Sequence, residues 1–146
     1  MVPYKIFAIN PGSTSTKIAL FEGNQPVFSS NVAHDAEVLK QYREISDQFD
    51  YRKETILEEV EKAGVSLEGV DAFSARGGGL VSVEGGVYVV NDKLLEHARA
   101  GFSVKHPAML GAQLADAFSK TYGGNAYVVN PPDVDEFSDL ARVTGW

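Results

Sequence analysis

The sequence predicts an α/β fold built on a five-stranded mixed sheet with flanking helices. Three strand-like segments joined by short turns occupy the first 32 residues, and two further strand-like segments then alternate with helix-length segments. Short turns require antiparallel neighbours, whereas helix-length connections allow parallel crossovers. The expected order is therefore βββ-α-β-α-β, with an antiparallel three-strand meander first.

The meander is predicted from apolar runs over residues 4–9, 17–21 and 25–32. The first two runs are separated by a polar turn, and Gly23 with Asn24 provides the second turn signal. Asp35 is expected to cap a short helical piece that extends to residue 40. A longer amphipathic helix follows over 47–63, and Gly64 supplies its stop.

The rest of the chain predicts strands and helices in alternation. Pro107 suits the first position of a helix, and Gly123 with Gly124 would end it. The expected elements are a strand over 70–75, a small accessory strand over 85–90, helices over 92–101 and 107–122, and a strand over 126–129. This arrangement resembles one lobe of the ribonuclease H-like domains of the actin, acetate kinase and sugar kinase superfamily.

Composition narrows the class of protein. The 146 residues fit one domain, and a net charge of −7 argues against binding to a nucleic-acid backbone, so we expect no nucleic-acid partner. The absence of cysteine excludes disulfides and thiolate metal sites. Apolar runs are too short for a membrane span or a signal-peptide core, which leads us to expect a cytoplasmic protein with no membrane partner.

The turn Asn10-Pro11-Gly12-Ser13-Thr14-Ser15-Thr16-Lys17 carries the strongest chemical signal. A hairpin needs glycine or asparagine for its backbone angles, but it does not need four consecutive hydroxyl residues. Backbone N–H groups and hydroxyls around a tight turn can hold an anion such as phosphate. An ordinary polar hairpin is the alternative at this point.

Two other segments follow strand ends. The strand over 70–75 delivers Arg76 and the glycines Gly77, Gly78 and Gly79, and the strand over 126–129 delivers residues 130–135. Ligands of open α/β sheets bind at such ends, so these segments can converge with the hydroxyl-rich turn on a common cleft. The alternatives are a surface ion pair for Arg76 and a rigid turn for Asn130-Pro131-Pro132.

The residues quoted above carry a family resemblance. The turn resembles the opening signature of the acetate and butyrate kinase family, and Arg76-Gly77-Gly78 resembles the butyrate-kinase form of a later motif. Further similar segments, in order, are Gly85 to Asn91, His106 with Leu110-Gly111, and Val134 to Gly145. The matches extend from residue 6 to residue 145.

The resemblance implies reversible phosphoryl transfer from ATP, with Mg²⁺, to a short-chain carboxylate. By the family match, Asn10, Gly12 and the hydroxyls of Ser13, Thr14 and Ser15 would lie near the transferred phosphate and its metal, and Lys17 would add a supporting charge. Arg76 would neutralise the carboxylate or the moving phosphoryl group, and Gly77 and Gly78 would allow close approach of the backbone. No side chain is assigned as a direct metal ligand.

Two residues are uncertain members of this site. Asn130 stands where related kinases carry an aspartate, and an amide cannot act as a base. Either Asp133 or Asp135 would have to substitute for that aspartate, or the catalytic step that depends on it is weakened. His106 lies where the family has a histidine near the active site, although a helix-start histidine is more often structural. His34 and His97 lie in polar segments, and we expect both at the surface.

The resemblance also implies that residues 1–146 form a single N-terminal lobe of a two-lobe kinase. The nucleotide-binding C-terminal lobe is then a missing partner, the chain alone is expected to be inactive, and the full-length protein is expected to be a homo-oligomer. Butyrate is favoured as substrate over acetate or propionate. A non-catalytic binding or assembly module with the same fold remains the alternative from a different class.

Overall fold

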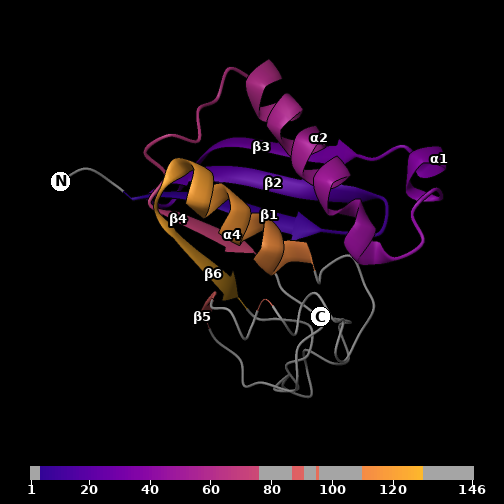
Figure 1. The fold of residues 1–146 in the computed structure, drawn as a ribbon. Helices are drawn as coiled ribbons and strands as arrows, with labels where there is room; N and C mark the ends of the chain where they lie inside the picture. The colour runs from indigo at the N-terminus through magenta and orange to yellow at the C-terminus, as the bar shows by residue number, and fades with distance from the viewer. Residues whose placement is uncertain (1–3, 76–86, 91–94, 96–109, 130–146) are drawn as a thin grey trace, which may run out of the picture.

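The computed structural model describes residues 4–75, 87–90, 95 and 110–129. Within these residues the strands form one mixed six-stranded sheet in the order β3-β2-β1-β4-β6-β5. The strands are β1 Lys5–Pro11, β2 Ser15–Glu22, β3 Gln25–Ala33, β4 Ala72–Ala75, β5 Val87–Val89 and β6 Asn125–Val129. The expected fold class is confirmed, and Figure 1 shows the strands side by side.

Strand pairing follows the prediction in direction. β1, β2 and β3 form the antiparallel meander, whereas β4 pairs parallel with both β1 and β6. The sheet has six strands instead of five because the segment expected as an accessory strand joins it as β5, antiparallel to β6. Pairing with β6 satisfies the backbone groups of β5 along one side.

The described helices are α1 Ala36–Leu39, the 3₁₀ turn η1 Ile45–Gln48, α2 Phe49–Lys62 and α4 Gly111–Tyr122. Asp35 caps α1 as expected, since its carboxylate accepts from the Glu37 N–H at 2.9 Å. The long helix begins with η1, where Glu44 and Asp47 form a capping box. The expected start at Pro107 and the helix over 92–101 lie outside the described residues, apart from Leu95, which is helical.

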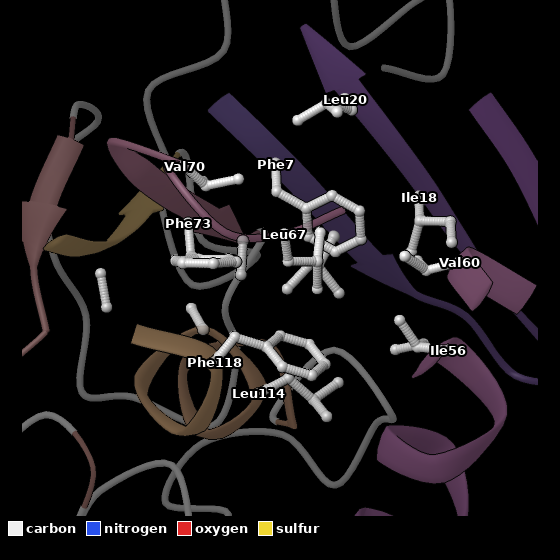
Figure 2. Close-up of a cluster of buried hydrophobic side chains, with 14 of the residues drawn as sticks. Phe7, Ile18, Leu20, Ile56, Val60, Leu67, Val70, Phe73, Leu114 and Phe118 are labelled. Carbon is white, nitrogen blue, oxygen red and sulfur yellow. The ribbon is translucent and has the colours of Figure 1, made fainter. Parts of the chain in front are cut away.

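Helices α2 and α4 cover the same face of the sheet (Figure 1). Beneath them lies the hydrophobic core, in which Phe7 of β1, Phe73 of β4 and Phe118 of α4 are fully buried. The ring centroids of these three residues lie 5.9 to 6.1 Å apart, within the range of favourable aromatic pairs. Ile56 and Val60 of α2 lie beside Ile18, next to this aromatic cluster, as Figure 2 shows.

Parallel pairing brings three strand ends to one end of the sheet. Ile9, near the end of β1, is the register partner of Ala75, which ends β4, and Ala75 is in turn the partner of Val128 in β6. The turn that joins β1 to β2 therefore leaves the sheet at the same end as the carboxyl ends of β4 and β6. This is the end at which α/β sheets bind ligands.

Candidate functional site

The hydroxyl-rich turn is a tight connection closed by backbone pairing. Asn10 pairs with Lys17 and Pro11 with Thr16 across β1 and β2, and the Gly12 N–H donates to the Ser15 carbonyl at 2.7 Å. A Cβ atom added at Gly12 would lie 3.2 Å from that carbonyl oxygen. The close approach explains why glycine suits this position.

The tip of the turn is open to solvent. Ser13 and Thr14 are exposed, as are Asn10 and Lys17 at its base, while Ser15 is partly buried and Thr16 is fully buried. Within the described part of the chain, the N–H groups of Ser13 and Thr14 donate to no other group. The tip thus presents hydroxyls and backbone donors together, the combination that an anion needs.

Arg52 of α2 lies directly beneath the turn and is fully buried. Its Nη2 donates to the Ser13 carbonyl at 3.2 Å, and its Nη1 lies within reach of two acceptors, the Ser15 carbonyl at 3.4 Å and the Thr16 hydroxyl at 3.3 Å. Its Nε donates to the Gln48 side-chain carbonyl at 3.1 Å. One guanidinium group therefore ties the turn to the first turns of α2.

The charge of Arg52 is not neutralised by any carboxylate that the structure describes. Among the described residues, no carboxylate lies within ion-pair distance of its guanidinium. Burial lowers the pKa of Arg52 to about 10, while the nearby Tyr51 acts in the opposite direction. The group remains cationic at neutral pH, so the turn lies over a buried positive charge.

His34 is a correction to the sequence-based expectation, because it is buried and not at the surface. Its Nε2 lies 2.8 Å from the Thr16 hydroxyl, and its ring lies 5.5 Å from that of Tyr51. Burial, followed by the charge of Arg52, lowers the pKa of His34 from 6.5 to about 4. A neutral ring fits a chain in which Thr16 accepts from Arg52 and donates to Nε2.

Sequence patterns could have located both buried residues. Arg52 precedes Ile56 by four positions and Val60 by eight, which places it on the buried stripe of α2. His34 follows the buried Val32 by two positions, which places it on the inward face of β3 and its extension. In both cases the helical or strand spacing predicts burial, although the residue itself is polar.

The other expected site residues lie outside the described residues. They are Arg76, Gly77, Gly78, His106 and Asn130. Arg76 follows the last residue of β4 in sequence, and Asn130 follows the last residue of β6. The structure therefore brings together the members of the turn and leaves these five as sequence-based assignments.

A hollow of about 700 Å³ lies beside the junction of η1 and α2. No residue of the hydroxyl-rich turn contributes to its described lining, so we assign it no part in anion binding. The hollow is lined by Gln41, Tyr42, Arg43, Ser46, Asp47, Phe49, Asp50 and Gln113.

Across the described ranges, no cluster of histidine, aspartate and glutamate could hold a metal ion. No helix in these ranges is long and apolar enough to cross a membrane.

Comparison with solved structures defines the class of fold. The chain superposes on Porphyromonas gingivalis acetate kinase with a TM-score of 0.50 and 14% identity, covering 97% of this chain and 43% of that one. A Ppx/GppA family member from Aquifex aeolicus also gives a TM-score of 0.50, at 10% identity over 87% of this chain and 52% of that one. The described part of the chain has the ribonuclease H-like fold of the acetate kinase and actin-like ATPase class.

Sequence comparison adds a relative of known name. The chain is 40% identical over 142 residues to butyrate kinase 2 of Clostridium acetobutylicum, covering 97% of this chain. In sequence the chain is therefore similar to a butyrate kinase. The match spans only 40% of the length of that relative. No protein-family model matches the chain.

Proposed function

We propose that this chain is the phosphoryl-handling lobe of a butyrate kinase-type enzyme, which transfers a phosphoryl group between ATP and a short-chain carboxylate. The observation that carries the proposal is the tip of the turn, where Ser13 and Thr14 are exposed, their N–H groups donate to no described group, and the buried cation of Arg52 lies beneath. Phosphoryl transfer depends on positioning and on neutralisation of charge, and such a turn serves both. The similarity to butyrate kinase 2 supports the reaction class.

Within this proposal, the turn contacts the transferred phosphate through Asn10, Gly12, Ser13, Thr14 and Ser15. Lys17 is the cross-strand partner of Asn10 and is exposed beside it, so it can add a positive charge at the same edge. No described carboxylate forms an ion pair with Lys17 or with Arg52. The turn fits a phosphoryl group better than it fits a bare metal ion.

ATP and Mg²⁺ are the proposed cofactors. Mg²⁺ usually keeps several waters and is held by one or two carboxylates together with substrate phosphates. The turn offers hydroxyl and amide oxygens but no carboxylate, so the metal would be held chiefly by phosphate oxygens and water on this side. The first carboxylates that follow β6 in the sequence are those of Asp133 and Asp135.

Arg76, Gly77, Gly78, His106 and Asn130 complete the proposed site. The end of β4 lies in register with β1 and β6 at the end of the sheet where the turn emerges. Arg76 and Asn130 are the next residues after those strand ends, which supports their assignment to the same cleft. Arg76 would neutralise the carboxylate or the phosphoryl group, and Asn130 would act through hydrogen bonds because its amide cannot serve as a base.

The proposed enzyme needs a second, nucleotide-binding lobe, with residues 1–146 as its first lobe. The chain spans about 40% of the length of its curated relative, which is consistent with such a division. We further propose a cytoplasmic homo-oligomer without nucleic-acid partners, in keeping with the net charge of −7. Alone, this chain is expected not to turn over.

A chimera tests the function. The segment of Clostridium acetobutylicum butyrate kinase 2 that this chain matches is replaced by residues 1–146, and ATP-dependent butyryl phosphate is trapped and measured. We expect turnover by the chimera and none by the chain alone. Ser13→Ala in the chimera should lower kcat by about 10²-fold, the usual loss for one donor to a transition-state oxygen.

Ser29→Ala is the matched control, because Ser29 is an exposed serine of β3 away from the turn, and its kcat should equal that of the parent chimera. Folded chimera without butyryl phosphate formation would contradict the proposal, as would full turnover by the isolated chain. Competition among acetate, propionate and butyrate then assigns the carboxylate. A folded chimera with no activity on any of them would favour the non-catalytic module.

A further inference from the structure

We infer that Arg52 is a positioning residue for the phosphate-binding turn, an assignment that rests on the function proposed above. Arg52 belongs to α2 and lies 36 to 39 positions beyond its acceptors in the sequence. It lies outside the motifs quoted above for the family resemblance. Its role follows from the contacts of its guanidinium group.

Those contacts fix the direction of a peptide unit in the turn. The Ser13 carbonyl points inward to Nη2 of Arg52, at 3.2 Å. In a trans peptide, the N–H of the next residue points the opposite way, and the described residues contain no cis peptide. The Thr14 N–H is therefore directed away from α2, on the side where Ser13 and Thr14 are exposed. Arg52 thus holds an anion-binding donor outward.

The same guanidinium secures the closing contacts of the turn. The Ser15 carbonyl accepts both from Nη1 of Arg52 and from the Gly12 N–H. The Thr14 carbonyl accepts from the His34 N–H at 2.9 Å, and the side chain of His34 contacts Thr16, which is also bonded to Arg52. Loss of the guanidinium would loosen several residues of the turn at once.

Arg52 also supplies a positive charge that can act on a bound phosphoryl group without contacting it. It is fully buried, and within the described part of the chain no carboxylate neutralises it. A charge screened poorly by water acts over a longer range than an exposed one. A phosphoryl group above the turn would therefore gain from Arg52 although the guanidinium faces the carbonyl side.

Lysine retains the charge but cannot reproduce the planar fork of donors, and methionine removes both. The test compares Arg52→Lys and Arg52→Met with Ile56→Val, which weakens the same helix one turn later without touching the turn. Hydrogen exchange of the Gly12 and His34 N–H groups reports positioning in the free protein. Inorganic phosphate titration, followed by the amide signals of residues 12–15, reports binding.

In both Arg52 variants we expect the Gly12 and His34 N–H groups to exchange about tenfold faster than in Ile56→Val, the effect of losing one net hydrogen bond. Phosphate affinity should fall about fivefold or more in Arg52→Met and less in Arg52→Lys. If Arg52→Met does not fold, Gln48→Leu, which removes the acceptor of Nε, should give a smaller acceleration at the same two groups.

Exchange at Gly12 and His34 equal to that of Ile56→Val would overturn the inference. A wild-type chain whose turn signals do not respond to phosphate would overturn the proposed function instead. Faster exchange in that case would still support a positioning role in the turn, so the two failures are distinguishable.

Discussion

The polar residues buried beneath the turn form one connected group. Arg52 donates to Thr16, and Thr16 lies within hydrogen-bond distance of His34. The Nδ1 atom of His34 is buried and has no partner among the described residues. Buried polar groups without partners cost stability, and they persist where surrounding contacts or function hold them. Here the surrounding contacts belong to the proposed phosphate site.

His34 makes stability sensitive to acid. Its folded-state pKa of about 4 lies below the unfolded value of 6.5, so the unfolded chain takes up the proton first as the pH falls. Stability present above pH 6.5 is therefore lost between that pH and about 4. Burial and then the charge of Arg52 set this balance, and Thr16 and Tyr51 are the described groups packed against the ring.

His34→Gln should abolish this component because glutamine does not titrate. Between pH 7 and pH 5, the free energy of unfolding of the wild type should fall by about 2 kcal/mol more than that of His34→Gln. Denaturant unfolding at both pH values measures the difference. Parallel losses in the two proteins would show that His34 titrates normally and that it is not held neutral by burial.

At the scale of elements, α2 joins the core to the site. Ile56 and Val60 belong to the hydrophobic cluster, and Arg52, on the same stripe, reaches the turn (Figure 2 shows the apolar part). A rigid helix anchored by apolar burial can hold a guanidinium at fixed geometry. The arrangement explains why a polar residue occupies a core-facing position.

The junction of α4 and β6 depends on glycine at one position in particular. Gly124 has φ +80°, and a Cβ atom there would lie 2.5 Å from the Val70 carbonyl oxygen. Gly123, its neighbour, has φ +89° but no atom near such a Cβ. The two positions therefore separate the cost of a steric overlap from that of backbone conformation alone.

Gly123→Ala should cost about 1–2 kcal/mol, because its backbone (φ 89°, ψ −173°) lies in a region that essentially only glycine adopts. Gly124→Ala should cost about 2–4 kcal/mol, because the added methyl group also displaces the chain that enters β4. Equilibrium unfolding of both variants provides the measurement. Equal stability costs for the two variants would mean that the chain entering β4 moves away from the added methyl group without loss of stability.

Elements were more predictable than the contacts between them. The meander, its turns and the long helix follow from local patterns such as Gly23-Asn24 and the stop at Gly64. The strand β5 was harder to assign, since joining the sheet depends on an edge of β6 that is distant in the chain. Local propensity predicts an element, whereas its partner depends on the rest of the fold.

At the scale of the whole molecule, the site divides into local and distant parts. The turn from Asn10 to Lys17 could be predicted because its residues are consecutive, and the structure shows it exposed at one end of the sheet. Arg52 could not be assigned from a motif because its acceptors are 36 to 39 positions away. Arg76, His106 and Asn130 remain predictions.

The chain accounts for about 40% of the length of its butyrate kinase relative. Strand ends of β1, β4 and β6 meet at one end of the sheet, which gives the proposed cleft its floor on this side. A nucleotide-binding lobe would supply the opposite side. We therefore expect this chain alone to bind phosphate but not to catalyse turnover.

The most direct test is a phosphate titration of the isotope-labelled chain, followed residue by residue at the backbone amides. The central claim predicts saturable shifts at Ser13, Thr14 and Ser15, with little change at Gly23 in the other hairpin turn, which serves as an internal control. Absence of shifts at the hydroxyl-rich turn, or equal shifts at both turns, would contradict the account.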